Sequence, residues 1–310
     1  MAISALLKIK GGFFMKNKYE KFYKEVPKNY IEKLNSFRIS HQEKKLRVNG
    51  VEWRYISSGS GKEVIVLLAG GMGVGEVFFS HIIDLEKSFK VIVPSFPEVS
   101  TIKELVDGIN NIMQKEGRYQ FNILGQSFGG ILAQEMIRNN PRNIKKVILS
   151  HTTTSSNAIN ESIMDEYINK IRKLIKLVKL LPMCILKSLF KKKICRLLST
   201  IKLEERKFWE SYFAELIYSK TKKQEISIYE CMVDFAQNYI YSKEDFEKWK
   251  GKMLILEADT DDSFEKVQKS AVRELFNEAQ SYEFKGTGHL SIIAAREEYI
   301  KIVKDFLKIA

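Results

Sequence analysis

Short apolar runs alternate with stretches of helical periodicity over the first half of the chain and again near its end. Apolar runs bounded by Gly, Pro or Asn are typical of strands, whereas apolar positions recurring every three or four residues are typical of helices. The pattern predicts strands at residues 45–48, 51–56, 63–69, 90–94, 120–124, 145–150, 252–256 and 280–284. It predicts helices at residues 17–40, 102–114, 265–279 and 296–307, and helical stretches that end near 86 and 139. Asn49-Gly50 predicts a hairpin between the first two strands.

The alternation stops between residues 159 and 249, where the pattern is mostly helical. Strands that alternate with helices imply a mostly parallel, twisted sheet flanked by helices on both faces. We therefore expect an α/β fold with a helical cap or lid, residues 152–249, inserted after the sixth strand. The core comprises residues 45–151 and 250–310 in this interpretation, and residues 1–44 form an N-terminal helical extension. In such sheets, functional sites form at the carboxyl ends of the strands.

Residues 125–130 read Gly-Gln-Ser-Phe-Gly-Gly and stand between a predicted strand and a predicted helix. A serine on so sharp a turn holds its hydroxyl above the strand end, and its neighbours must be small because a larger Cβ would meet nearby backbone. The plainer alternative is a purely structural glycine-rich turn. The strand before and the helix after the motif favour a nucleophile elbow with Ser127 at its tip.

A serine hydroxyl needs an adjacent base, and His289 is the favoured one among the four histidines. It lies in Gly-Thr-Gly-His just past the last predicted strand, and the chain order serine, acid, histidine requires a late histidine. We expect His41 and His81 to be surface or core residues. His151 ends the sixth strand and could line the pocket, but that position is less usual for a base.

Three carboxylates follow the seventh predicted strand, and one of them is expected to orient the base. In related folds the acid commonly lies three residues after a small residue that closes the strand, and counting from Ala258 gives Asp261. Asp259 and Asp262 remain the alternatives. Each of the three could instead be a solvated turn acid or a helix N-cap.

The charge on a tetrahedral intermediate needs preorganised N–H donors. One is expected to be the backbone N–H of Phe128, which also begins a helix whose positive dipole end favours an anion. The second is expected from the loop after the third strand, with Gly71 favoured and Met72 as the alternative. That Gly-rich loop could be taken for a nucleotide cradle, but its Gly-x-Gly spacing is imperfect and no Lys-Ser/Thr follows it.

With these motifs in this order, the chain resembles α/β-hydrolases over about residues 45–310. The resemblance implies a Ser127–His289–Asp261 triad. It departs from the family by carrying Ala69-Gly70 where His-Gly is usual after the third strand. The first half is also similar to maspardin-type proteins, which implies that a non-catalytic binding role is an alternative to catalysis. That similarity lies in Ser36-Phe-Arg38, Trp53, residues 67–73, 77–79 and 91–94, and the elbow.

The positive charge is concentrated in the predicted cap. The chain has a formal net charge of +13, and residues 167–203 contain eleven Lys or Arg and no Asp or Glu. Over residues 168–181 the apolar positions fall on one helical face and most of the lysines fall elsewhere. The favoured interpretation is a cap helix with a solvated Lys face; the alternative is a lid that meets anionic lipid or an acidic substrate. No nucleic-acid recognition module is present, so no nucleic-acid partner is expected.

The remaining composition bears on location and cofactors. Cys184, Cys195 and Cys231 are odd in number and form no CxxC pair, so neither a disulfide framework nor a zinc site is expected. Reduced thiols fit a cytoplasmic protein, and no apolar run is long enough to span a bilayer. Met15 begins a more ordinary start, so we expect residues 1–14 to be an upstream extension.

These inferences converge on a serine hydrolase that cleaves a carboxylic ester or related acyl bond through an acyl-serine intermediate. No metal or organic cofactor is expected, and the partner is a small acyl substrate. Two alternatives stay open at this point. One is a hydrolase-like binding or adaptor protein without catalysis, and the other is a triad enzyme that cleaves C–C bonds or transfers an acyl group.

Overall fold

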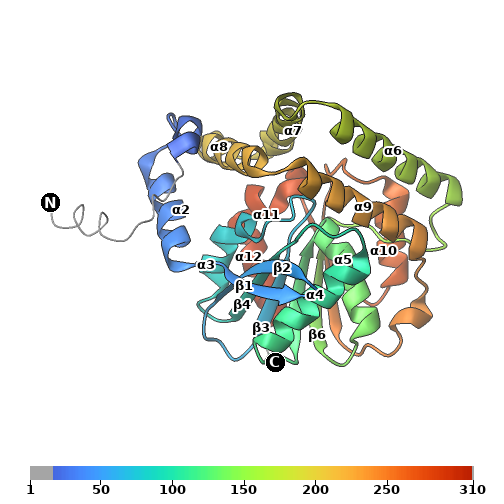
Figure 1. Ribbon diagram of the computed structural model, residues 1–310. Coiled ribbons are helices and arrows are strands. Elements are labelled where there is room, and N and C mark those ends of the chain that lie inside the picture. Colours follow the sequence, from blue (N-terminus) through green and yellow to red (C-terminus); the bar gives the residue numbers. More distant parts are fainter. Residues whose placement is uncertain (1–16, 309–310) are drawn as a thin grey trace.

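The computed structural model describes residues 17–308, and an eight-stranded sheet of order β1-β2-β4-β3-β5-β6-β7-β8 runs through its centre (Figure 1). The first two strands form an antiparallel hairpin, β2 pairs antiparallel with β4, and all other pairings are parallel. The strands are β1 (Lys44–Val48), β2 (Val51–Ser58), β3 (Val64–Leu68), β4 (Lys90–Ser95), β5 (Phe121–Gln126), β6 (Ile144–Ser150), β7 (Lys252–Ala258) and β8 (Gln280–Phe284). Every predicted strand is therefore present, most of them with ends shifted by one or two residues.

The burial of the strands follows from their sequences. All residues of β3 and of β5 are buried, as expected for central parallel strands covered on both faces. The β1–β2 hairpin turns at Asn49 and Gly50, whose φ angles of 48° and 83° match the turn that suits the strand twist. This hairpin lies at the edge of the sheet and carries several exposed charged side chains.

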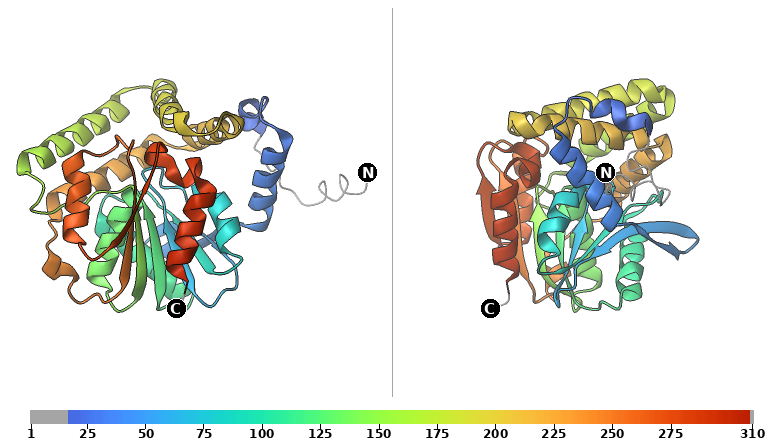
Figure 2. Two further views of the ribbon diagram at one scale, coloured as in Figure 1. Left: turned by 180° about the vertical axis from the view of Figure 1, so that it is seen from behind. Right: turned by 90° about the vertical axis from the view of Figure 1, so that its left-hand side faces the viewer.

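Helices cover both faces of the sheet (Figure 2). On one face α3 packs against α12, and on the other α4 packs against α5. The helices of the body are η2 (Gly75–Phe78), α3 (Phe79–Leu85), α4 (Ile102–Lys115), α5 (Phe128–Asn139), α10 (Lys266–Leu275), η5 (Gly288–Leu290), α11 (Ser291–Ala294) and α12 (Arg296–Leu307). The α4 helix approaches β2 so closely that a Cβ added to Gly108 would lie 1.8 Å from the Trp53 ring.

Two predicted helices differ from the structure. The predicted helix 17–40 is split into η1 (Asn17–Phe22) and α2 (Lys28–Ser40). Pro27 is the N-cap of α2, and a proline disfavours the helical conformation in the residue before it, so the first segment cannot continue into the second. The predicted helix 265–279 ends at Leu275, and its last four residues form a turn before β8. The predicted extension at residues 1–14 lies outside the described residues.

The inserted segment forms four long helices that lie across the carboxyl ends of the strands (Figure 1). They are α6 (Glu161–Leu180), α7 (Met183–Leu197), α8 (Leu203–Ser219) and α9 (Lys222–Asn238), with η3 (Leu198–Thr200) and η4 (Lys243–Phe246) beside them. The outer helices α6 and α7 pack on the inner helices α9 and α8, respectively. Among residues 17–308, no helix has both the length and the apolarity to cross a bilayer.

A partly buried charge network joins the N-terminal helix, the loop region after β3 and the cap. Arg38 of α2 contacts Glu76 of η2 at 2.6 Å and Glu215 of α8 at 3.0 Å. The Tyr23 hydroxyl donates to Glu215 at 2.6 Å, and the Tyr212 hydroxyl donates to Glu76 at 3.2 Å. Three segments far apart in the sequence are thus held at one junction, beside the loop that leads from β3 to the site.

Candidate active site

Ser127 lies on a sharp turn between β5 and α5. Its φ and ψ angles of 53° and −116° are uncommon for a non-glycine residue, as expected at a nucleophile elbow. A Cβ added to Gly125 would lie 2.4 Å from the Gly129 carbonyl oxygen, and one added to Gly129 would lie 2.1 Å from the Leu68 carbonyl oxygen. The two glycines of the motif are therefore required by close backbone approach.

The backbone of the elbow is held from both sides by the end of β6. The Ser127 N–H donates to the Ser150 carbonyl at 2.8 Å. The Thr152 hydroxyl donates to the Ser127 carbonyl at 2.7 Å. Gly70 faces the side chain, since a Cβ added there would lie 3.3 Å from the Ser127 Cβ.

The late histidine and one of the three candidate acids form a hydrogen-bonded pair. His289 Nδ1 lies 2.9 Å from Asp261 Oδ2, and the Asp261 side chain is only 2% exposed. The second carboxylate oxygen accepts the Ser263 N–H at 2.9 Å. Burial by itself raises the pKa of Asp261, but the bond and the charge of His289 outweigh it and hold that pKa well below its usual range. The acid therefore stays ionised beside the imidazole.

The two alternative acids have other partners. Asp259 Oδ1 accepts the Gly286 N–H at 2.8 Å, which ties the acid loop to the base loop. Asp262 forms an exposed ion pair with Arg196 of α7, with 2.6 Å between them. Neither carboxylate contacts His289 in the described part of the chain, so the geometry favours Asp261 as the partner of the base.

Ser127 and His289 line the same cavity, which has a volume of about 1250 Å³ and lies between the carboxyl ends of the strands and the cap. Within residues 17–308 the Ser127 hydroxyl makes no hydrogen bond, so the contact to His289 is not closed in this structure. Such contacts are often long before a substrate is bound. The cap side of the cavity is mainly apolar, although charged side chains such as Lys170 and Lys193 also line it. Its apolar residues include Ile163, Ile171, Leu174, Phe190, Ile194, Phe213, Ile217 and Met232.

Backbone N–H groups are available where an oxyanion would form. Gly71, its alternative Met72, and Phe128 all line the cavity. Among the described residues, the N–H groups of Gly71 and Phe128 have no acceptor in the protein. Phe128 is the first residue of α5, so its N–H belongs to the unpaired donors of a helix N-terminus. These groups could bind an anionic oxygen above Ser127.

The other histidines have structural partners. His41 contacts Glu86 at 2.7 Å, and His81 is buried with Nε2 2.7 Å from the Ile292 carbonyl oxygen. His151 is buried beside the candidate base, with 5.9 Å between the two ring centroids. Sequence reasoning placed His151 at the strand end but did not identify its contacts, because they depend on a φ of +48° at that residue.

No metal centre is built into this region. Within residues 17–308, no three His, Cys, Asp or Glu side chains are grouped so that they could hold a metal ion. Among the polar groups that line the cavity are a serine, a histidine with a buried carboxylate, and backbone N–H groups without an acceptor in this range. This set can attack an electrophilic carbon, move a proton and bind an oxyanion.

Residues 63–295 match the family model described as the alpha/beta hydrolase fold. The chain belongs to the α/β-hydrolase family. The match extends from β3 to the start of α12, so it contains the elbow, the acid loop, the base loop and the inserted cap.

Solved α/β-hydrolase structures superimpose on most of the chain. Carboxylesterase CesB from Bacillus subtilis has a TM-score of 0.68 at 11% identity and covers 94% of this chain and 98% of its own. An enol-lactonase from Burkholderia xenovorans LB400 has a TM-score of 0.67 at 18% identity, covering 85% and 99%. The meta-cleavage product hydrolase CumD from Pseudomonas fluorescens IP01 has a TM-score of 0.64 at 20% identity, covering 85% and 96%. At these identities the likeness concerns the fold alone.

The comparison with curated proteins yields no match. The similarity of the first half to maspardin-type proteins therefore stays a prediction. What the family leaves open is the bond that is cleaved and the substrate that carries it.

Proposed function

We propose that this α/β-hydrolase is a serine hydrolase that cleaves a carboxylic ester through an acyl-serine intermediate. The observation that supports it most is the His289–Asp261 pair, which shares one cavity with Ser127 on its strained turn. Each member lies at the carboxyl end of a strand, although the three are separated by up to 162 residues in the chain. A purely structural glycine-rich turn would have no need of a buried imidazole–carboxylate pair in the same cavity.

The proposed reaction begins when His289 takes the proton of the Ser127 hydroxyl while the oxygen attacks the ester carbonyl carbon. The carbonyl π electrons move to the oxygen, and the N–H groups of Gly71 and Phe128 stabilise the resulting anion. The imidazolium then gives its proton to the alkoxide that leaves, and the acyl group remains on Ser127. Water attacks the acyl-serine by the same steps in reverse order, with Asp261 stabilising the imidazolium each time.

The cavity supports a bulky apolar acyl group. Its volume of about 1250 Å³ exceeds the usual range for small-molecule sites, which ends near about 1000 Å³. Aliphatic and aromatic side chains of the cap line the same cavity as Ser127, and burial of one methylene there contributes about 0.8 kcal/mol. We therefore expect kcat/KM to rise from acetate to medium-length and longer acyl esters.

An activity-based probe tests the proposal directly. A fluorophosphonate should label the wild-type protein, whereas Ser127→Ala should give no labelled adduct. Ser270→Ala is the matched control, because Ser270 also lines the cavity but donates to a carbonyl of its own helix. Equal labelling of the wild type and Ser127→Ala would contradict the assignment, and a folded protein that is never labelled and turns over no ester would favour the non-catalytic binding role.

The structural relatives act on different bonds, so the bond itself needs a separate experiment. Their names include a carboxylesterase, an enol-lactonase and a meta-cleavage product hydrolase. A panel of p-nitrophenyl esters, lactones and vinylogous 1,5-diketones should give the highest kcat/KM for an ester. A higher value for the diketone would favour C–C cleavage, and strong acceleration by added alcohol would favour acyl transfer.

We also propose that the outer cap, formed by helices α6 and α7, faces an anionic bilayer. Of the eleven basic residues between 167 and 203, only Arg196 has an ion-pair partner in the described part of the chain. Large apolar side chains lie exposed among them, with Leu180 at 80% and Ile185 at 45%. Unpaired lysines around exposed leucines suit the headgroup layer of a membrane, where each Lys contributes about 1 kcal/mol.

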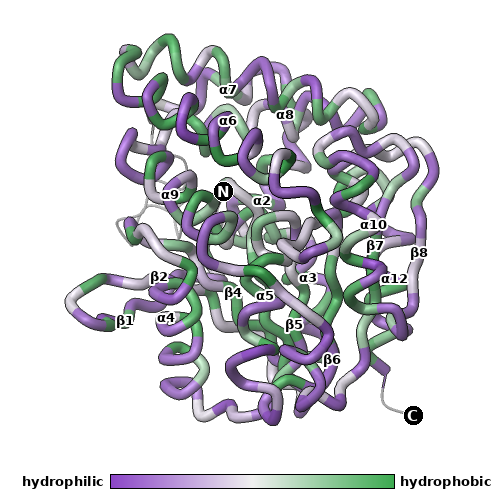
Figure 3. Tube along the Cα trace, turned by 90° about the vertical axis from the view of Figure 1, so that its right-hand side faces the viewer, coloured by the Kyte–Doolittle hydropathy of each residue, from purple (hydrophilic) through white to green (hydrophobic). Residues whose placement is uncertain are grey.

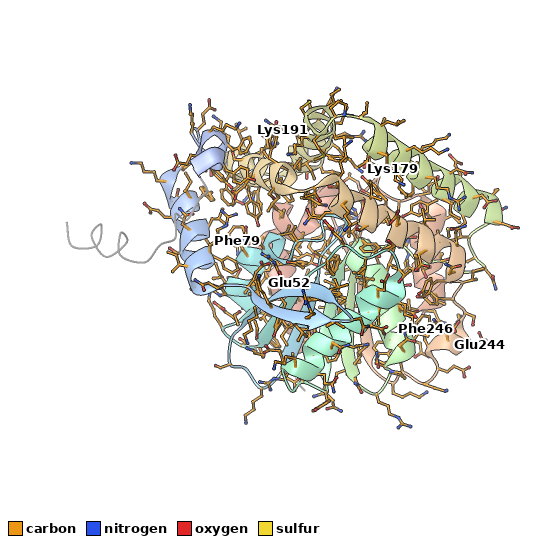
Figure 4. All side chains as sticks on the ribbon, viewed as in Figure 1. Glu52, Phe79, Lys179, Lys191, Glu244 and Phe246 are labelled. Carbon is orange, nitrogen blue, oxygen red and sulfur yellow. The ribbon has the colours of Figure 1, made fainter. Side chains whose placement is uncertain are left out.

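The outer cap also borders the cavity, since Lys170 of α6 and Lys193 of α7 are both among its lining residues. The labelled Lys179 and Lys191 lie on these two outer helices (Figure 4). In this arrangement a bilayer held by the cap would lie near the cavity, and an amphiphilic ester could enter directly from the membrane.

Liposome co-sedimentation tests the membrane proposal. The protein should pellet with phosphatidylglycerol vesicles, not with phosphatidylcholine vesicles, and less so as salt rises. Replacing Lys191, Lys192 and Lys193 by Gln should reduce binding about tenfold or more. Replacing Lys248, Lys250 and Lys252, which lie exposed at the opposite end of the sheet, is the matched control. An equal loss with both triple variants would show that total charge, and not this surface, is responsible.

We further propose a cytoplasmic location, in which Cys184, Cys195 and Cys231 remain the free thiols that the structure contains. Alkylation in intact cells followed by mass spectrometry should find all three modifiable after denaturation without reductant. A fraction that requires reductant would contradict this location.

A further inference from the structure

A chain of polar side chains, all buried except the partly exposed Thr287, connects the candidate base loop to the elbow strand through a second histidine. Thr287 Oγ1 and Ser291 Oγ are 2.6 Å apart, and Ser291 Oγ is 2.8 Å from His151 Nε2. His151 Nδ1 is 3.0 Å from Ser150 Oγ, which is 2.6 Å from Gln126 Oε1. Gln126 Nε2 is 3.2 Å from the carbonyl oxygen of His289. The chain of contacts thus begins and ends on the loop that carries the base.

The direction of each hydrogen bond follows from its far end. A carbonyl oxygen only accepts, so the amide nitrogen of Gln126 must face His289 and the amide oxygen must face Ser150. The Ser150 hydroxyl therefore donates to Gln126, and its own oxygen is left to accept the Nδ1–H of His151. His151 is consequently assigned the tautomer with the proton on Nδ1.

The other ring nitrogen of His151, Nε2, is then unprotonated and needs a hydrogen-bond donor. Ser291 Oγ lies 2.8 Å from His151 Nε2 and 3.1 Å from the carbonyl oxygen of Gly288. We assign its single proton to His151, because that contact is the shorter one and Nε2 would otherwise have no donor among the described residues. The Thr287 hydroxyl then donates to Ser291. All five bonds now run in one sense, from Thr287 to the His289 carbonyl. This order requires a neutral His151, in keeping with burial and the nearby His289 charge, which lower the pKa of His151 to about 3.

The residues on either side of His151 hold the nucleophile. Ser150 accepts the Ser127 N–H through its carbonyl, and Thr152 donates its hydroxyl to the Ser127 carbonyl. His151 between them has a φ of +48°, a conformation that non-glycine residues rarely adopt and in which His is enriched. One tripeptide at the end of β6 therefore contacts the backbone of the nucleophile on one side and the loop of the base on the other.

We propose that Ser150–Thr152 is a positioning element that sets the distance between Ser127 and His289, with the Nδ1–H tautomer of His151 as its central link. This proposal rests on the proposed hydrolase function for its catalytic consequence. None of the three residues is assigned a chemical step. His151 acts through the loop of His289, because an ordered chain of bonds limits how far residues 287–289 can move from the elbow.

The tautomer is tested without catalysis, by two-bond 1H–15N spectra of histidine-labelled Ser127→Ala protein at neutral pH. The structure predicts that His151 protonates Nδ1, while His81 protonates Nε2, because its Nε2 contacts the carbonyl oxygen of Ile292. His81 is thus an internal control, and loss of one set of peaks in a His151→Asn variant assigns the signals. A His151 with an Nε2 proton, or with both nitrogens protonated, would overturn the proposal whatever the protein catalyses.

The catalytic consequence is tested with matched variants at Thr287. Thr287→Val removes the first donor with little change of shape, and Thr287→Ser restores it. We expect Thr287→Val to slow fluorophosphonate labelling and to lower kcat about 10- to 100-fold with KM nearly unchanged, since a small displacement of a catalytic group has effects of this size. Thr287→Ser should recover most of the wild-type rate.

A second pair separates positioning from a general loss of packing. Ser291→Ala interrupts the chain at a fully buried hydroxyl and should slow labelling to a similar extent. Ser80→Ala removes a hydroxyl that is equally buried beside His81 but outside the chain, and it should label at the wild-type rate. Equal rates for all four variants would overturn the positioning role. If the wild type is not labelled at all, the proposed function fails while the tautomer experiment still decides the hydrogen-bond order.

Discussion

The body of the molecule is closely packed, whereas most residues of the outer cap, helices α6 and α7, are not buried. In the body, β3 and β5 are buried at every position, and the close approach of the β3 backbone leaves no room for a side chain on Gly129. In the outer cap, the 20-residue helix α6 buries only Ile168, Ile171 and Val178, and the 15-residue helix α7 buries only Leu186. Figure 3 shows the same difference, with apolar strands at the centre and mixed hydropathy along α6 and α7.

The charges differ in the same way. Many ionised side chains of the body and of the inner helices have partners, such as Arg38 with Glu76 and Glu215. In the described part of the chain the outer cap leaves all but one of its basic side chains without an acidic partner. The difference teaches that the body is specified by packing, whereas the surface of the outer cap is little constrained by stability and is free to serve a substrate or a membrane.

The largest loss of stability is expected from an added side-chain atom at a position of the body that has no free space. Gly129→Ala should reduce the free energy of unfolding by about 3 kcal/mol, because the new Cβ would lie 2.1 Å from a backbone oxygen of β3. Ser188→Ala on the exposed face of α7 is the matched control and should change it by less than about 0.5 kcal/mol. Urea denaturation measures both, and similar values for the two variants would remove the contrast.

A substitution at the junction between body and cap should lower the free energy of unfolding almost as much. Arg38→Met leaves Glu76 and Glu215 close together without their shared cation, so we expect a loss of about 2–3 kcal/mol. Arg196→Met breaks an ion pair of similar length whose partners are 77% and 64% exposed, and it should cost less than about 0.5 kcal/mol. Thermal and urea unfolding of the two variants would sharpen the comparison, and equal losses would contradict it.

Acid should act on the body, because all four histidines lie outside residues 152–249. Burial lowers the pKa of His81 to about 4. A lowered histidine pKa means that the unfolded chain binds the proton first, so this stability is complete above about pH 6.5 and is lost as pH falls toward 4. We expect His81 to contribute about 1 kcal/mol to the loss between pH 6.5 and 5.5.

The acid experiment compares how steeply the free energy of unfolding changes with pH, and not the absolute stability of the two proteins. His81→Gln should flatten the dependence of unfolding free energy on pH by that amount, even if the variant is less stable throughout. The carboxyls of Glu43 and Glu257, whose pKa values partial desolvation raises, act in the opposite sense and are unchanged in the variant. An unchanged slope would show that His81 does not titrate on unfolding.

The smallest effect on stability is expected from the charges of the outer cap. Replacing Lys191, Lys192 and Lys193 by Gln should change the free energy of unfolding by less than about 0.5 kcal/mol, since none of them has an ion-pair partner in the described residues. The same variant is the one expected to lose liposome binding. A marked change in stability would mean that these lysines serve the fold, which would end the contrast between the two regions.

Local sequence was sufficient for the elements and their order. The apolar runs predicted all eight strands, and the small residues around Ser127 predicted the turn, because strand burial and close backbone approach leave direct marks on residue type. The order of Ser127, the acid loop and His289 was also readable. The prediction of one helix over residues 17–40 rested on helical spacing alone and did not take account of Pro27, where the structure breaks it.

Only the tertiary structure decided which polar groups meet. The sequence favoured Asp261 by its spacing from Ala258 but left Asp259 and Asp262 open, and the path of one turn directs only Asp261 toward His289. The contacts of His151 were hidden for the same reason, since its partner Ser291 lies 140 residues away and a left-handed φ directs its ring between Ser291 and the adjacent Ser150. Periodicity records which side chains are buried, whereas the direction of a hydrogen bond depends on where distant segments place its two ends.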